Sequence, residues 1–391
     1  MENTVAHIGM NKLLLVVVLV LICFGAAEVY TSTAQATAAH DKVAEYYLMK
    51  HLSKVLAGFV LIFFFARVFD YGNWLWFGRV VFAVGVILTI AAILFGPKIN
   101  GAHRWIWGIQ PSEILKLGLF SCVCAKLSQA GDNIKSVACT IIQPGIFLGI
   151  SAVLLALQPN FSMLAMFTCV VACVLLVAGA NPKYLGMVAG AAMPVIATVL
   201  MVTEHSRARI MAFFAEDGGM KESNHQLEHS LLALGNGGFT GTGFGQGVQK
   251  LGYLPEAHKD VVYSVIGEEF GLVGTLFVLA LFAVLFSQGL NIARNSSSRF
   301  GKYFAFALTL SLFFNFALHI SVCVGLCPTT GQPLPFFSFG GTNLFYSCIV
   351  IGILLNISRP TTGKKIKEPY MSGASLESSA YRNYEFTRSG V

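Results

Sequence analysis

The stretch KLLLVVVLVLICFGAAEVYT, residues 12–31, decides the class of this protein. From Leu13 to Ala27 it runs without a charge, and a helix of about 20 mostly apolar residues is long enough to cross a bilayer. The same stretch resembles the core of a signal peptide. Because nine more such runs follow and only Lys12 precedes the apolar core, we expect an uncleaved first membrane helix.

The composition extends this conclusion to the whole chain. Apolar residues make up 55% of it and charged residues 12%, whereas a soluble domain has about 25% charged residues. These figures exclude a disordered chain, a nucleic-acid-binding arm and a small disulfide scaffold. We therefore expect an all-α integral membrane protein with about ten transmembrane helices. The ten apolar runs lie at residues 12–31, 51–71, 76–96, 113–130, 139–157, 161–180, 184–202, 262–288, 303–326 and 338–357.

The charge distribution predicts the orientation. With the amino terminus inside, fifteen Lys and Arg residues fall on the cytoplasmic side and six on the outer side, as the positive-inside rule requires. Both termini are then cytoplasmic. Residues 1–360 form one polytopic membrane domain, in which 203–261 is a large extracytoplasmic loop between helices 7 and 8. Residues 361–391 lack apolar periodicity and are predicted to be a disordered cytoplasmic tail.

Small residues can let membrane helices approach closely. Gly145 and Gly149 form one G-x-x-x-G pair, and Gly186 and Gly190 form another. We expect these pairs to lie at helix–helix contacts, and we assign no chemistry to them.

A charge in hydrocarbon costs at least about 2.5–3.5 kcal/mol, so each ionisable residue near a span needs an explanation. The first polar cluster comprises GAHRW at 101–105 and QPSEILK at 110–116. Its Pro-Ser pair predicts a helix start, and Glu113 and Lys116 are spaced to pair on one helical face. From these residues alone, a helix cap with an interfacial ion pair explains the cluster as well as a binding site does.

The second and third clusters lie in the long loop and at the start of the eighth helix. The glycine-rich run at 235–247 does not fit a dinucleotide-binding motif, and a flexible external loop explains it. In LPEAHKDVVYS at 254–264, Asp260 falls at the outer boundary, where helix capping is the simplest explanation. Glu268 and Glu269 lie about two turns deeper, so at least one should find a basic or hydroxyl partner inside the protein.

Two patterns suggest metal binding and a third predicts an irregular segment. HQLEH at 225–229 matches the inverted zinc-protease motif H-x-x-E-H, but without an obvious third ligand we expect no metal there. The nine cysteines lie mostly in apolar runs and are expected to be packing residues. The segment 325–341 contains three prolines, which predict an outer or re-entrant loop shielded by protein or water.

Four segments together carry a resemblance to a known family. They are GAHRW…QPSEILKLG at 101–118, LQPNFS at 157–162, ALGNGGFTGTGFGQGVQKLGYLPEAHKDVVYSVIGEEFGLVG at 233–274 and PTTGQPLPFFSFGGTN at 328–343. The chain resembles the SEDS family of ten-helix bacterial cell-wall glycosyltransferases, and its YLPEAH and PTTG strings are closer to the division-type members (FtsW) than to the elongation-type members (RodA). It departs from the family pattern at Asn160, where an Asp is common, at Lys259 and Val261, and at His103.

The resemblance implies a function and a site. SEDS proteins polymerise lipid II, an undecaprenyl-pyrophosphate disaccharide-pentapeptide, at the outer face of the cytoplasmic membrane. It implies Asp260 as the catalytic carboxylate. The substrate-binding residues would be Arg104, Glu113, Lys116, His258 and Lys259. No resident cofactor or metal is expected, although a divalent cation beside the pyrophosphate is left open.

The resemblance also implies partners and a location. A class B penicillin-binding protein and other division proteins are the expected partners, nucleic acid is not, and the division septum is the expected site. Two other functions remain open at this point: a lipid II flippase or transporter, and a RodA-type elongation polymerase. A non-catalytic scaffold in a division complex is a third. A transporter would show interrupted helices and buried acids near the bilayer midplane.

Overall fold

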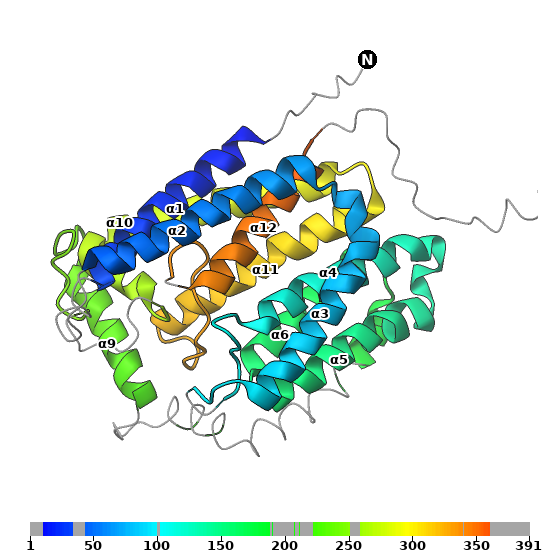
Figure 1. The fold of residues 1–391 in the computed structure, drawn as a ribbon, viewed down its shortest axis with the longest axis horizontal. Helices are drawn as coiled ribbons and strands as arrows, with labels where there is room; N and C mark the ends of the chain where they lie inside the picture. Colours follow the sequence, from blue (N-terminus) through cyan, green and yellow to red (C-terminus); the bar gives the residue numbers. More distant parts are fainter. Residues whose placement is uncertain are drawn as a thin grey trace, which may run out of the picture.

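The computed structural model describes residues 11–33, 44–99, 102–187, 222–250, 259–338 and 340–359, with residues 190, 207 and 211. In these ranges the chain forms helices and no β-strand (Figure 1). The helices are α1 (Lys12–Thr33), α2 (Ala44–Phe63), α3 (Trp74–Phe95), α4 (Pro111–Ala130), α5 (Gln143–Leu157), α6 (Phe161–Ala178), α9 (Glu222–Gly237), α10 (Val262–Asn295), α11 (Arg299–Cys323) and α12 (Gly341–Ile357). Short helical segments precede α3 and α5: the π-helices η1 (Phe64–Val68) and η4 (Ala138–Ile142) and the 3₁₀-helices η2 (Tyr71–Asn73) and η3 (Gly131–Lys135).

These helices confirm the predicted all-α membrane fold. Seven helical segments among the described residues are long and apolar enough to cross a membrane. Two further predicted spans are also helices, but α4 is too charged to count among the seven, with Glu113, Lys116 and Lys126, and α12 is too short, with 17 residues. The predicted span 184–202 and the tail 361–391 lie largely or wholly outside the described residues.

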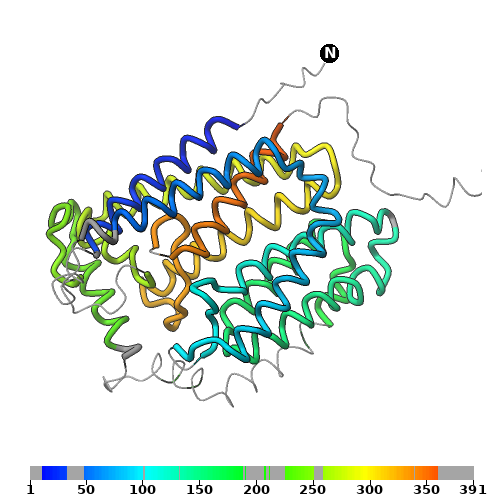
Figure 2. Tube along the Cα trace, viewed as in Figure 1, coloured from blue at the N-terminus to red at the C-terminus, as the bar shows by residue number. Residues whose placement is uncertain are grey.

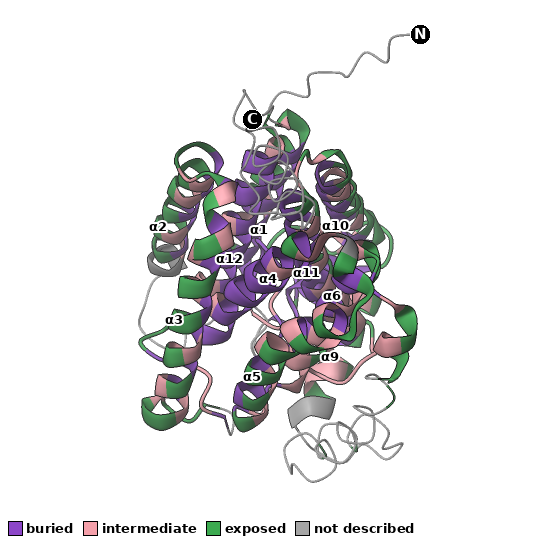
Figure 3. Cartoon of the chain, turned by 90° about the vertical axis from the view of Figure 1, so that its right-hand side faces the viewer, coloured by how far each residue is buried: buried purple, intermediate pink, exposed green. Residues whose placement is uncertain are grey.

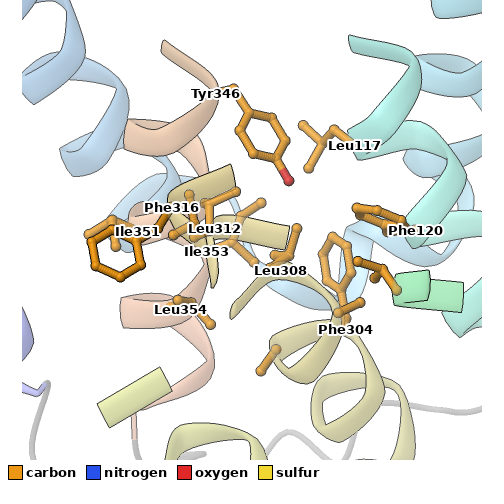
Figure 4. Packing of buried hydrophobic residues seen from close by; sticks show 14 of the residues in the cluster. Leu117, Phe120, Phe304, Leu308, Leu312, Phe316, Tyr346, Ile351, Ile353 and Leu354 are labelled. Carbon is orange, nitrogen blue, oxygen red and sulfur yellow. The ribbon is translucent and has the colours of Figure 1, made fainter. Parts of the chain in front are cut away.

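Helix α4 forms the centre of the bundle. Sixteen of its 20 residues are buried, because other helices surround it instead of lipid. Figure 3 shows α4, α11 and α12 with mostly buried residues, while α2, α3 and α5 present exposed ones. Figure 4 shows how Leu117 and Phe120 of α4 face Phe304 and Leu308 of α11. Exposed apolar side chains on the outer helices, such as Leu56, Ile87 and Val153, are suited to contact lipid.

Glycines bring α3 and α4 into close contact. A Cβ atom at Gly118 would lie 2.4 Å from the backbone nitrogen of Phe82, and one at Gly85 would lie 2.7 Å from Cα of Leu115. Within the described ranges, a Cβ atom at Gly145 or Gly149 would meet nothing within 4 Å, so the helix–helix contact predicted for this pair is not found there. Gly186 and Gly190 belong to the predicted span 184–202, which lies largely outside the described residues, so the prediction for this pair is not tested. The spacing G-x-x-x-G marks a small-residue face but does not identify which helix covers it.

The described connections gather at two opposite ends of the bundle (Figure 2). At the Asn11 end, Asn11 donates to Gln288 over 2.8 Å, Tyr71 N donates to Asn356 Oδ1 over 3.0 Å, and Arg359 donates to the carbonyl of Ala66 over 3.1 Å. The start of α1, the α2–α3 connection and the end of α12 therefore share one end. The alternation of connections predicted from the sequence requires this arrangement.

Candidate active site

Asp260 lies immediately before α10, at the opposite end of the bundle, here called the Asp260 end. Lys259 and Asp260 are half-buried in a turn, and Val261 is the N-cap residue of α10. The side chain of Val261 offers no acceptor to the first turn, so capping falls to another element. A Cβ atom at Gly331, in the loop between α11 and α12, would lie 3.5 Å from Oδ2 of Asp260. The carboxylate therefore faces this loop.

The loop between α11 and α12 is irregular, as its prolines predict, and protein shields its second half, residues 332–338. Phe336 and Phe337 are buried, and Phe337 packs edge-on against Phe24 of α1, with ring centroids 5.5 Å apart. Phe336 has φ +69°, a conformation that costs a bulky residue free energy and is found at functional sites. A Cβ atom at Gly25 would lie 2.3 Å from the carbonyl oxygen of Phe336, so α1 needs glycine at this position.

Two side chains join this loop to the segment that carries Asp260. Ser338 Oγ donates to the carbonyl of Lys259 over 2.6 Å and accepts from the amide of Leu334 over 2.7 Å. His319 of α11 is buried. Its Nδ1 lies 2.9 Å from the carbonyl oxygen of Gln332, and its Nε2 lies 3.4 Å from the amide of Tyr263. These partners assign the proton to Nδ1 and leave Nε2 as an acceptor.

Glu113 and Lys116 form the predicted ion pair, but inside the protein and not at an interface. Lys116 Nζ lies 2.6 Å from Glu113 Oε2, and the two side chains are 0% and 2% exposed. The ammonium group also lies 3.7 Å from the centre of the Tyr346 ring of α12, a cation–π contact. Tyr346 in turn hydrogen-bonds Ser311 of α11 over 2.5 Å. Burying such a pair is costly, which favours a functional role over a stabilising one.

Arg104 joins two connections at the Asp260 end. Its Nε donates to the carbonyl of Gln158 over 3.2 Å, and its Nη2 donates to the carbonyl of Pro159. Gln158 returns a bond from Nε2 to the carbonyl of His103 over 3.0 Å. The guanidinium group is therefore committed in part to backbone carbonyls. Its role as a substrate ligand stays a prediction.

Helix α10 is interrupted at Gly271, where φ is +63° and ψ is −157°. The glycine-rich run crosses this break and supplies its missing hydrogen bonds. Thr242 N donates to the carbonyl of Glu268 over 2.9 Å, and Leu272 N donates to the carbonyl of Gly238 over 3.0 Å. The interpretation of residues 235–247 as a flexible loop was therefore wrong: residues 235–237 end α9, and residues 238–250, here called the glycine-rich run, are bonded to α10.

The two acids before the break are both buried and both partnered, as expected. Glu268 accepts from the amides of Val248 and Gln249 over 2.9 and 3.2 Å. Glu269 accepts from the amide of Gly245 over 2.9 Å and pairs with Lys250. Glu28 of α1 is also fully buried, and its carboxylate makes no hydrogen bond among the described residues.

Some sequence predictions find no counterpart at this site. His258 lies outside the described residues, so its role stays a prediction. His229 of the H-x-x-E-H pattern contacts Gln249 over 2.7 Å, and its ring lies 4.1 Å from that of His225. In the described part of the chain, no three His, Cys, Asp or Glu side chains are grouped to hold a metal ion. The sequence analysis missed His319, because a single histidine in an apolar run is a weak signal.

Comparisons with known proteins identify the family. A family model described as cell cycle protein, covering FtsW, RodA and SpoVE, matches residues 11–363. The chain is 31% identical over 364 residues to a probable peptidoglycan glycosyltransferase FtsW of Geobacter sulfurreducens, covering 90% of this chain and 96% of that protein. It is 32% identical over 351 residues to a protein of the same name from Borreliella burgdorferi, covering 88% and 95%.

Solved structures support the fold at 20% sequence identity. A chain from work described as "Structural coordination of polymerization and crosslinking by a peptidoglycan synthase complex" aligns with TM-score 0.73, covering 92% of this chain and 100% of that one. The rod shape determining protein RodA of Thermus thermophilus aligns with TM-score 0.65, covering 93% and 100%. The family match and the relatives above 30% identity confirm the SEDS resemblance: this chain belongs to the FtsW/RodA/SpoVE family of multi-pass membrane proteins.

Proposed function

We propose that this protein is a peptidoglycan glycosyltransferase that polymerises lipid II at the outer face of the cytoplasmic membrane. Relatives that cover most of its length carry the name peptidoglycan glycosyltransferase FtsW, which also favours a role in septal synthesis. The observation that carries the proposal is the placement of Asp260, a half-buried carboxylate at one end of the bundle that faces the exposed Gly331 of the α11–α12 loop.

The reaction needs one base and a stable leaving group. Asp260 accepts the proton of the acceptor sugar hydroxyl as that oxygen attacks the anomeric carbon of the growing strand. The new C–O bond forms as the bond to the pyrophosphate breaks, and the pyrophosphate departs as an anion without protonation. A single displacement inverts the anomeric carbon, from an α-linked pyrophosphate to a β-linked glycan. Cationic groups that meet the departing charge lower the barrier.

The remaining site residues receive supporting roles in this proposal. Lys116, held by Glu113, and Arg104 would attract the pyrophosphate groups, and His258 and Lys259 directly precede the base in the sequence. Helix α12 and the loop before it contact both parts of the site, through Ser338 at Lys259 and Tyr346 at Lys116. No resident cofactor is expected, and glycan synthesis in the presence of EDTA tests whether a divalent ion assists.

The deciding experiment compares purified wild type with Asp260→Asn on labelled lipid II. We expect the variant to insert and fold normally and to lose at least about 10²-fold in strand synthesis, because a general base contributes about 10²–10⁴-fold. Asp70→Asn is the matched control. Asp70 lies at the Asn11 end, where its carboxylate accepts from the amide of Gly72 over 3.2 Å. Full activity of Asp260→Asn would remove the proposed base.

A transporter of the lipid precursor is the second candidate, because α10 is interrupted and buried acids lie beside the break. Against it, the acids at 268 and 269 are already bonded to the glycine-rich run and Lys250, and that run also completes the break. A liposome flipping assay run beside the polymerisation assay separates the two functions. A scaffold without catalysis predicts that glycan synthesis survives Asp260→Asn in cells that depend on the variant.

The partner and the location follow the same proposal. One structural neighbour comes from a peptidoglycan synthase complex in which polymerization and crosslinking are coordinated, which supports a class B penicillin-binding protein as partner. We expect co-purification with such a protein and a higher polymerisation rate in its presence. A fluorescent fusion should gather at the septum, with both termini in the cytoplasm.

A further inference from the structure

Asp260 has no regular secondary structure of its own to hold it. It precedes the N-cap residue Val261, whose side chain gives no capping bond, and it follows residues 251–258, which lie outside the described part. The position of the carboxylate therefore depends on the contacts of residues 259–263 with other elements. Catalysis by a general base is sensitive to such placement, because an error of 1 Å can cost about 10²-fold.

His319 supplies one of these contacts from inside the bundle. Its Nε2 accepts from the amide of Tyr263, a first-turn amide that has no partner within α10. Its Nδ1–H donates to the carbonyl of Gln332, one residue beyond Gly331, which faces the Asp260 carboxylate. One imidazole thus connects the start of α10 to the loop that covers Asp260. The ring is 1% exposed, so its two partners are fixed by the packing around it.

Ser338 supplies the second contact from the other side. Its hydroxyl donates to the carbonyl of Lys259, the residue before Asp260. It also accepts from the amide of Leu334, so both its hydrogen-bonding roles are used. The two bridges therefore reach the chain on either side of Asp260, one at Lys259 and one at Tyr263, and both start from α11 or the loop that follows it.

We propose that His319 is a positioning residue for the glycosyl transfer, holding Asp260 and the covering loop in one fixed arrangement. Ser338 is its counterpart on the other side of the carboxylate. The inference rests on the proposed function, because it assumes that Asp260 is the base. It assigns His319 no contact with substrate, so its loss should lower kcat and leave KM for lipid II within about twofold.

The test uses three substitutions, of which one removes both hydrogen bonds of His319 and the other two each keep a different one. His319→Leu fills similar space and removes both bonds. His319→Gln can place its amide oxygen near the position of Nε2 and keep the bond to Tyr263. His319→Asn can place its amide N–H near the position of Nδ1 and keep the bond to Gln332. We expect kcat to fall about 10- to 100-fold in His319→Leu, with His319→Gln and His319→Asn between it and wild type.

Two controls separate positioning from stability. Leu308→Ala removes a fully buried side chain from the same helix, toward the Asn11 end, and should lower the melting temperature without changing kcat per folded molecule. Ser338→Ala should repeat the loss in kcat. Ser128→Ala, whose buried hydroxyl bonds the nearby carbonyl of Ala125 over 2.9 Å, should not.

Each outcome decides a separate question. If kcat of His319→Leu stays within about twofold of wild type, the inference is overturned. It is also overturned if the activity of His319→Leu falls only in proportion to its folded fraction, as in Leu308→Ala, or if His319→Gln and His319→Asn are as inactive as His319→Leu. If His319→Leu does not fold, His319→Gln, His319→Asn and Ser338→Ala carry the test. Full activity of Asp260→Asn in the same assay contradicts the proposed base itself, whatever the His319 variants do.

Discussion

At the residue scale, the carboxylate of Asp260 lies beside a glycine, Gly331. Gly331 has φ +66°, a left-handed conformation that costs other residues about 1–2 kcal/mol. A methyl group there would also lie 3.5 Å from Oδ2 of Asp260, in van der Waals contact with the carboxylate. We therefore expect Gly331→Ala to lower polymerisation about tenfold or more, measured as initial rate per folded molecule.

Gly179→Ala is the matched control for this prediction. Gly179 ends α6 with φ +90°, and a Cβ atom there would meet nothing within 4 Å. The substitution carries a comparable backbone cost at the opposite end of the bundle from Asp260. It should lower the melting temperature and leave the rate unchanged. Equal polymerisation rates in the two variants would show that Gly331 is needed only for its backbone conformation and not for its position beside Asp260.

At the scale of the helix, α10 depends on direct contacts with a segment that precedes it in the sequence. The break at Gly271 leaves carbonyls before it and amides after it, and residues 238–243 bond both sets. A Cβ atom at Gly271 would lie 2.4 Å from the amide nitrogen of Gly241. The break is therefore a joint between α10 and the glycine-rich run, with Glu268 and Glu269 bonded to the same run.

Gly271→Ala should accordingly destabilise the protein by more than the cost of about 1–3 kcal/mol that this glycine-only backbone conformation alone imposes. The displaced run carries Gly245, Val248 and Gln249, whose amides bond the buried Glu268 and Glu269. Thermal unfolding in detergent measures the effect. Gly235→Ala is the control, since a Cβ atom there meets nothing within 4 Å and alanine favours the helix α9. An unchanged melting temperature for Gly271→Ala would contradict the joint.

The helices were predictable from the sequence because a run of about 20 mostly apolar residues remains recognisable even where single polar residues interrupt it. The break at Gly271 was not, because a single glycine in an apolar run looks like any other membrane glycine. The pairing of Glu113 with Lys116 follows from spacing. Its burial does not, because α11 and α12 cover it from about 200 residues further along the chain.

At the scale of the whole molecule, function requires the Asp260 end to face outward. The described connections fix only that Asn11 and Asp260 lie at opposite ends, while the positive-inside rule predicts which end is cytoplasmic. Cysteine labelling decides this, in a background with the nine native cysteines replaced. Phe244, 51% exposed in the glycine-rich run, and Ser297, exposed between α10 and α11, are suitable positions.

We expect a membrane-impermeant maleimide to label Phe244→Cys in intact spheroplasts and Ser297→Cys only after permeabilisation. The reason is that lipid-linked disaccharide is polymerised outside, so its base must be reached from that side. A protein labelled the other way round would hold Asp260 in the cytoplasm. In that case the proposed polymerase function fails for this chain, even though the fold and the geometry around His319 stand.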